Sequence, residues 1–311
     1  MPKYPHGKVW INGRVVAGEE AAISVFSQAV LRGSCVYEGV RGYWSERRRN
    51  LFLWKLEPHL KRLEQSMKVM RMESPWTRED FRQAILDWVR ANGFKEDIHF
   101  RLNVYFDDAG RLDMRAYKPE EVDTCAFIAG GPRGDRARQQ QGIHMCVSSW
   151  RRIGDDAMPP RVKATANYQN SRLASVEARV NGYDDAVILN QSGRVSESSG
   201  ACVLIIRDGE LVAPPVTESI LESVTRACAL EMFGRSIGRA AERPVDRTEL
   251  YVADEAIMCG SAEEVTPIVS VDRVAVGDGK PGPLTQRLQA LFYAAVRGED
   301  EAYEKDLMAV Y

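Results

Sequence analysis

The stretch PPRVKATANYQNS, residues 159–171, decides both the fold and the chemistry of this 311-residue chain. It places Lys163 between two prolines and the start of a helix that we predict over 167–181. Valine and alanine flank the lysine, and such a partly apolar setting disfavours the charged form of a lysine side chain. A Schiff-base lysine needs a neutral amine, although a lysine in a loop is in most proteins only a solvated surface group.

Downstream of this stretch, short apolar strands alternate with helices. Glu197 lies between small hydroxyl residues just before one of these strands, and a Gly-Ser-Ala turn follows another. We predict strands at 185–190, 201–206 and 255–259, and helices at 220–234 and 284–297.

The residues upstream predict a separate α/β half. Asn12-Gly13 between apolar flanks is a strong hairpin signal, and Thr77 is a predicted N-cap for a helix that ends at Asn92-Gly93. Apolar residues at helical spacing predict another helix over 58–72. Strands are predicted at 34–44, 51–56, 98–106 and 123–131, and after residue 141 the pattern restarts with a strand at 143–150.

The polar, glycine-punctuated segment 131–141 is the best linker candidate in the chain. At about 150 residues per domain, the length fits two domains. We therefore expect an α/β fold of the α+β two-domain type. It should have a small N-terminal domain over 1–132, an interdomain loop over 133–141 and a larger domain over 142–311.

Composition and motifs exclude several classes of protein. Hydrophobic residues make up 44%, charged residues 28%, and the net charge of −2 favours neither nucleic acid nor an anionic membrane. No apolar run is long enough for a membrane helix, and the N-terminus lacks a signal peptide, so we expect a cytoplasmic protein with reduced cysteines. The four histidines show no paired spacing, and we expect no metal site. Hydrolase, kinase and dehydrogenase motifs are missing as well.

Ordered segments along nearly the whole chain resemble the class IV pyridoxal-phosphate enzymes, and the branched-chain amino acid aminotransferases most closely. The segments include GSCVYEGVRGY (33–43), HLKRL (59–63), FRLNV (100–104), KATANY (163–168), VSESSG (195–200), SVTR (223–226) and YVADEAIMCGSAEEVTPI (251–268). The resemblance implies the D-amino acid aminotransferase-like fold, pyridoxal-phosphate fold type IV. It also implies pyridoxal 5'-phosphate as cofactor, a homodimer, and ping-pong transfer of an amino group to a 2-oxo acid such as 2-oxoglutarate.

The resemblance also implies roles for single residues toward the cofactor. Lys163 matches the lysine that carries the cofactor covalently and moves the proton at Cα. Glu197 matches the acid that faces the pyridine nitrogen, and Tyr168 matches the tyrosine that hydrogen-bonds the ring hydroxyl. The phosphate is expected at Arg62, the amides of Val224 and Thr225, and Ser261. The alternatives are that Arg62 is a surface arginine and Thr225 an ordinary helix cap.

On the substrate side the resemblance assigns Tyr37, Gly39, Arg101, Ser261 and Ala262. Some positions depart from the family: Arg32, His99 and Arg133 stand where tyrosines are common, Gly130 where a tryptophan is, and Cys202 where an asparagine is. These changes remove aromatic walls and add cations, so we expect a pocket that is more polar than usual. The alternative is that Arg32 and Arg133 point outward or pair with acids such as Asp135.

Three other activities remain open. The same fold hosts D-amino acid or amine transaminases and aminodeoxychorismate lyase-like enzymes, and a protein could also hold pyridoxal phosphate without turnover. The segment Tyr37-Glu38-Gly39-Val40-Arg41 favours the branched-chain side, because the other enzymes usually differ there.

Overall fold

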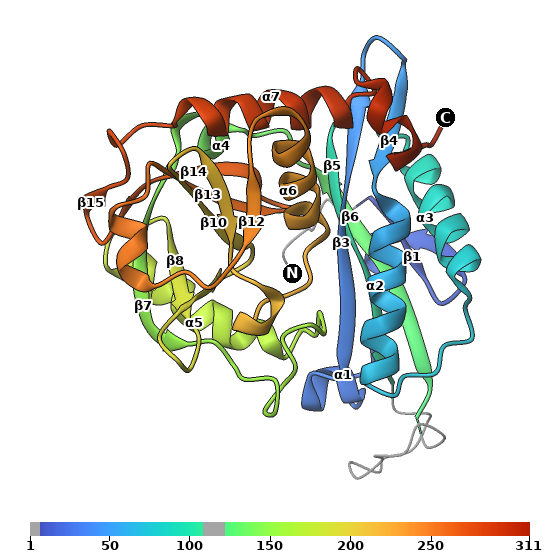
Figure 1. Cartoon of the computed structure of the whole chain (residues 1–311). Coiled ribbons are helices and arrows are strands. Elements are labelled where there is room, and N and C mark those ends of the chain that lie inside the picture. The colour runs from blue at the N-terminus through green and yellow to red at the C-terminus, as the bar shows by residue number, and fades with distance from the viewer. Residues whose placement is uncertain (1–6, 108–121) are drawn as a thin grey trace. The chain divides into compact units, whose positions relative to one another are not determined.

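A computed structural model of the chain describes residues 7–107 and 122–311. It divides into two compact units (Figure 1). Unit 1 contains Met1–Gly134, Val162–Ala166 and Val296–Tyr311, and unit 2 contains Asp135–Arg161 and Asn167–Ala295. The domain boundaries expected from the sequence stay a prediction, and the segment around Lys163 packs with unit 1.

Unit 1 is built on a seven-stranded antiparallel sheet. Strands β1 and β2 form the predicted hairpin: Asn12 and Gly13 have φ of 47° and 90°, the left-handed conformation that a two-residue turn between twisted strands requires. The strand order is β16 (Leu307–Ala309), β4 (Asn50–Trp54), β3 (Cys35–Ser45), β5 (Ile98–Phe106), β6 (Thr124–Pro132), β1 (Lys8–Ile11) and β2 (Arg14–Ala17).

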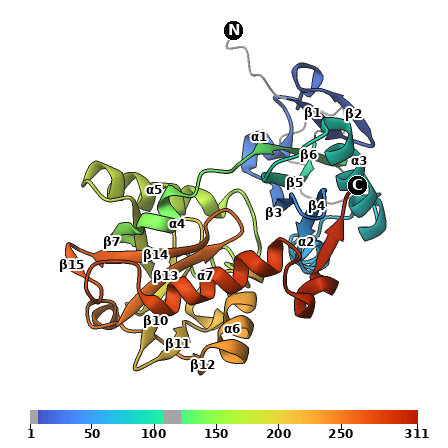
Figure 2. The same cartoon turned by 90° about the horizontal axis from the view of Figure 1, so that it is seen from above.

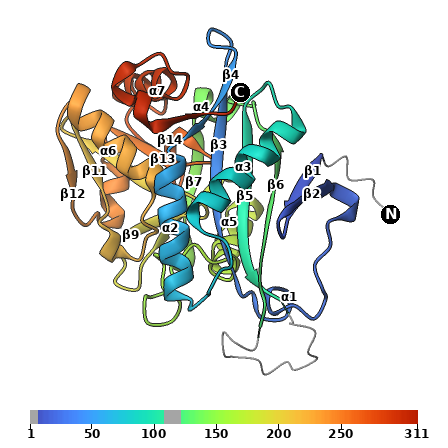
Figure 3. The same ribbon diagram turned by 90° about the vertical axis from the view of Figure 1, so that its right-hand side faces the viewer.

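Two long helices of unit 1, α2 (Leu56–Val69) and α3 (Arg78–Asn92), confirm the predicted ones. Figure 3 shows them side by side in front of the sheet. Thr77 caps α3 in a capping box with Asp80, and Gly93 ends it. A short helix, α1 (Gln28–Arg32), precedes β3 and was not predicted.

Unit 2 contains a nine-stranded sheet that closes into a small barrel, because β9 pairs with both β8 and β10. Its interior is filled by buried apolar side chains such as Val187, Val203 and Met258. The order is β12 (Ala240–Glu242), β11 (Glu210–Ala213), β10 (Cys202–Arg207), β13 (Glu255–Gly260), β14 (Glu264–Val271), β7 (Ile143–Arg151), β8 (Asp185–Leu189) and β9 (Val195–Ser198), with β15 (Val274–Ala275) beside β14.

The helices α5 (Asn167–Val180), α6 (Val224–Ser236) and α7 (Pro283–Val296) confirm three predictions. Helix α5 packs on β7 and β8, and Figure 2 shows α7 beside β14, where Gln289 donates to the Val265 carbonyl at 2.9 Å. The segment predicted as a linker contains a short helix, α4 (Ala137–Gln141), that the sequence did not predict. Gln139 anchors this helix through its carbonyl, which accepts from Gln289 at 2.7 Å.

Short 3-10 helices complete the described chain at Gly18–Glu20, Val216–Glu218, Arg247–Tyr251 and Glu301–Asp306. Within residues 7–107 and 122–311, no helix combines the length and apolar character needed to cross a membrane.

Candidate active site

Lys163 lies in a short extended segment that pairs with β3. The Tyr37 amide donates to the Lys163 carbonyl at 2.9 Å, and Val36 and Ala164 form a β-bridge. The Lys163 amide donates to Ser66 Oγ on α2 at 3.3 Å. The backbone of the lysine is therefore fixed from both sides by unit 1.

The half-buried amine of Lys163 lies over an aromatic ring. Its Nζ is 4.8 Å from the centre of the Tyr37 ring, and the Arg101 guanidinium carbon is 4.6 Å from the same centre. Gly39 pairs with Arg101 in register, and side chains two apart on a strand share a face, so Tyr37, Gly39 and Arg101 lie on one face of the sheet. The structure thus brings four predicted site residues together in unit 1.

Further cations surround His99 on this face. Arg41 pairs with His99 in register. Burial, and then the positive charges of Arg133, Arg41, Arg101 and Lys163, lowers the pKa of His99 to about 3, so its imidazole is neutral at pH 7. Arg133 is exposed and donates its amide to the Asp97 carbonyl at 2.8 Å. Arg32 is exposed at the last position of α1.

Arg62 is buried and held by a partner that the sequence did not reveal. Its Nε and Nη2 donate to the two carboxylate oxygens of Glu38, each at 2.7 Å, and His59 Nδ1 lies 2.7 Å from Glu38 Oε2. Burial alone would raise the pKa of Glu38, but the Arg62 charge and the hydrogen bonds from Arg62 and His59 lower it to about 2. Burial lowers the pKa of His59, so a neutral ring donates to the carboxylate.

The one sequence signal for this cluster is the spacing of His59 and Arg62, three residues apart on one face of α2. Arg62 is therefore not the surface arginine that the sequence left open: its side chain is 7% exposed.

Glu197, on β9 of unit 2, is also a buried acid with fixed partners. Arg152 Nη2 lies 2.7 Å from Glu197 Oε1, and the Leu221 amide donates to Oε2 at 3.1 Å. Arg152 follows directly after β7, and the sequence did not indicate that it belongs to the site.

The other predicted residues of unit 2 lie at element ends. Val224 and Thr225 form the first turn of α6, where Ser223 Oγ accepts from the Arg226 amide at 3.2 Å. First-turn amides lack intrahelical acceptors and, with the helix dipole, favour an anion. Ser261 and Ala262 form the turn between β13 and β14, and Tyr168 is half-buried in the first turn of α5.

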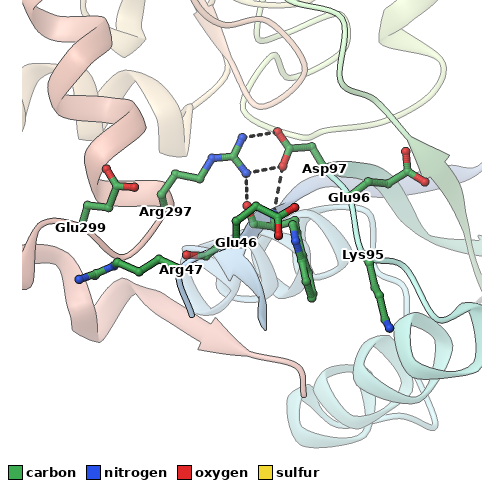
Figure 4. Close-up of a pocket in the computed structure, with 9 residues that line it drawn as sticks. Glu46, Arg47, Lys95, Glu96, Asp97, Arg297 and Glu299 are labelled. Carbon is green, nitrogen blue, oxygen red and sulfur yellow. Dashed lines mark hydrogen bonds and ion pairs between the residues drawn. The ribbon is translucent and has the colours of Figure 1, made fainter. Parts of the chain in front are cut away.

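A separate pocket of unit 1 lies beside the turn from β3 to β4 (Figure 4). Arg297 donates to Asp97 at 2.6 Å, and Figure 4 shows Lys95 pointing away from this pair. None of the predicted site residues lines it. The lining residues are Trp44, Ser45, Glu46, Arg47, Lys95, Glu96, Asp97, Arg297 and Glu299.

The groups present fit the pyridoxal phosphate predicted from the sequence. A half-buried amine at Lys163 suits an aldehyde, a buried carboxylate at Glu197 suits a ring nitrogen, and the start of α6 suits a phosphate. Arg152 lies beside that carboxylate. Two of its buried donors, Nε and Nη1, have no hydrogen-bond partner within the described ranges.

Comparison with known proteins agrees with this assignment. Residues 35–271 match the model of the family described as amino-transferase class IV. A probable branched-chain-amino-acid aminotransferase of Aquifex aeolicus is 35% identical over 97% of this chain and 96% of its own.

Solved structures are similar over the same length. The branched-chain amino acid aminotransferase of Thermobaculum terrenum, in its PLP form, has 39% identity and a TM-score of 0.92, covering 98% of this chain and 99% of its own. The branched-chain amino acid aminotransferase of Escherichia coli has 33% identity and a TM-score of 0.93, covering 98% of this chain and 100% of its own.

Proposed function

Because the chain belongs to the class IV aminotransferase family, we propose that it moves the amino group of a branched-chain L-amino acid to a 2-oxo acid such as 2-oxoglutarate. The observation that carries the proposal is the half-buried amine of Lys163 over Tyr37, in a chain similar along its length to branched-chain enzymes. The two half-reactions alternate, so the kinetics are ping-pong.

Pyridoxal 5'-phosphate is the cofactor, and when bound it supplies an electron sink for the electron pair left as Cα loses its proton. Lys163 is the residue that would hold the cofactor covalently, through its aldehyde. The free amine of Lys163 would move the proton between the substrate Cα and the cofactor.

The remaining cofactor contacts divide between ring and phosphate. Glu197 holds a proton on the ring nitrogen, and Tyr168 donates to the ring hydroxyl. The phosphate is bound by Arg62, whose orientation Glu38 fixes, by the amides of Val224 and Thr225, and by Ser261.

For the substrate, we assign the α-carboxylate to Arg101 and to the amides of Ser261 and Ala262, with Tyr37 and Gly39 as walls. The cations around His99 support a second, finer proposal: the pocket accepts a side chain with an acidic group better than a purely apolar pocket would. Arg133 is one of these cations, and we also assign Arg32 to this pocket. We further propose that the enzyme works as a homodimer in the cytoplasm.

A panel of amino donors tests these assignments. Purified holoenzyme is mixed with L-leucine, L-valine, L-glutamate, D-alanine or a primary amine, and conversion of bound cofactor to its pyridoxamine form is followed. We expect conversion with the L-amino acids, and continued turnover only with 2-oxoglutarate present. Conversion by D-alanine alone would favour the D-enzyme alternative, and turnover of aminodeoxychorismate without an acceptor would favour the lyase. Leucine rates far above those for every polar donor would contradict the proposed acceptance of acidic side chains.

A further inference from the structure

Arg152 is a buried cation that the proposed mechanism leaves unused. Its amide donates to the Leu189 carbonyl of β8 at 2.9 Å, and its carbonyl accepts from the Gln191 side chain at 3.0 Å. The backbone that carries the guanidinium is therefore anchored beside the barrel strands.

The guanidinium and the Glu197 carboxylate form a buried ion pair. Arg152 Nη2 lies 2.7 Å from Glu197 Oε1, and the two side chains are 4% and 9% exposed. The other oxygen, Oε2, accepts from the Leu221 amide at 3.1 Å. Because partners from different parts of the chain hold the two oxygens, the carboxylate cannot rotate without losing one of these bonds.

Stability alone does not account for this pair. Two donors of Arg152, Nε and Nη1, are buried with no hydrogen-bond partner in the parts of the chain that the structure describes. Buried donors without acceptors are costly, and a buried ion pair is often no more stabilising than apolar residues of the same volume. An arginine at this place therefore calls for a function beyond packing.

We propose that Arg152 is a positioning residue, which fixes the Glu197 carboxylate in the orientation that meets the ring nitrogen of bound pyridoxal phosphate. The inference rests on the proposed function, in which Glu197 holds the ring proton. A carboxylate that is already oriented needs no rearrangement while charge develops on the ring. Arg152 itself acts only through Glu197.

A double-mutant cycle tests this role. The variants are Arg152→Gln, Glu197→Gln and the double variant, with Arg152→Lys as the conservative change that keeps the charge. Arg297→Gln is the matched control, because Arg297 also holds an ion pair of low exposure, with Asp97 at 2.6 Å. The readouts are kcat and KM per bound cofactor, the absorption spectrum of the bound cofactor against pH, and cofactor affinity of the apoprotein.

We expect Arg152→Gln to lower kcat by about 10- to 100-fold, the usual cost of losing a partner that orients a functional group, with KM changed by less than about threefold. The cofactor spectrum should change its pH dependence. In the Glu197→Gln background the same substitution should cost less than about twofold, because its target is already gone. Arg152→Lys should recover part of the loss, and it reports on the role if Arg152→Gln does not fold.

Equal losses in both backgrounds would overturn the inference. So would an Arg152→Gln enzyme that resembles Arg297→Gln, with lower thermal stability but an unchanged spectrum and kcat. A wild-type protein that neither binds pyridoxal phosphate nor transaminates would instead contradict the proposed function, so the two failures are distinguishable.

Discussion

Tyr37 and Glu38 are neighbours in the sequence whose side chains point to opposite faces of β3. Tyr37 lies under the Lys163 amine, while Glu38 holds Arg62 and His59 on α2. One strand therefore positions the proposed reactive amine and the proposed phosphate arginine at once.

Replacing Glu38 tests this arrangement. Glu38→Gln leaves the buried Arg62 charge without its counter-ion, and breaking one partner of a buried pair costs about 3–5 kcal/mol. We expect that loss in urea unfolding, together with weaker binding of pyridoxal phosphate. Glu57→Gln, on the helix α2 that also carries Arg62, is the control: its pair with Arg82 is partly exposed, so the loss should stay below about 1 kcal/mol. Equal effects of the two substitutions would contradict the role of Glu38.

The same carboxylate predicts a pH dependence. Its folded-state pKa of about 2 lies below the ordinary value of 4.5, so the unfolded chain binds its proton first as the pH falls. The stability that Glu38 contributes is complete above pH 4.5 and is lost as the pH falls toward 2. We expect this group to add up to about 1.4 kcal/mol per pH unit to the slope in that window. Equilibrium unfolding at several pH values should give a shallower slope for Glu38→Gln; identical slopes would refute the assignment.

Arg152 shows what residue patterns alone could not predict. It forms its ion pair with Glu197 because β7, β8 and β9 are neighbours in the barrel, and the local sequence does not indicate that strand pairing. Glu38 lies in the Tyr37–Arg41 segment that resembles the family, but its ion pair with Arg62 depends on how α2 packs against β3.

Among the elements, those with strong local signals were predicted well. The hairpin at Asn12-Gly13 and helix α3 follow from turn and capping chemistry that acts within a few residues. The strands that were missed include β9, β11 and β14. The first two are four residues long, and β14 contains Pro267, a residue that usually argues against an inner strand. Their pairing partners in the barrel, and not their own residues, make them strands.

The capping box of α3 gives a stability prediction at this scale. Thr77 Oγ1 accepts from the Asp80 amide at 3.2 Å, and Asp80 accepts from the Thr77 amide at 2.8 Å. Thr77→Ala should lower the free energy of unfolding by about 1 kcal/mol in urea denaturation followed by circular dichroism. Gln83→Ala, which removes only a contact with Asp87 on the same helix, should cost a few tenths. A Thr77→Ala protein as stable as wild type would be the contrary result.

For the whole molecule, the ordered motifs predicted the family, and the match over residues 35–271 confirms it. Each compact unit of the structure is made of segments that are far apart in the sequence. The five residues around Lys163 and the last sixteen residues pack with unit 1. A prediction that cuts the sequence into consecutive domains cannot assign such segments to the first unit.

The proposed homodimer leads to a prediction about surface residues. Val25, Phe26 and Val30 of unit 1 are 69%, 48% and 60% exposed, an apolar group that water disfavours and a second copy could cover. We expect wild-type protein to sediment as a dimer or a multiple of it, and Val30→Asp to shift it toward the monomer. Val252→Asp, at an exposed valine of unit 2, should leave the dimer intact. A wild-type monomer would contradict the dimer, and a dimeric Val30→Asp would place its interface elsewhere.

The most direct measurement is chemical trapping of the cofactor. Holoenzyme is reduced with borohydride, digested, and its peptides are sequenced by mass spectrometry. We predict one pyridoxyl-phosphate adduct, on Lys163, and none in Lys163→Ala. An adduct on a different lysine, or none on protein that binds the cofactor, would contradict it.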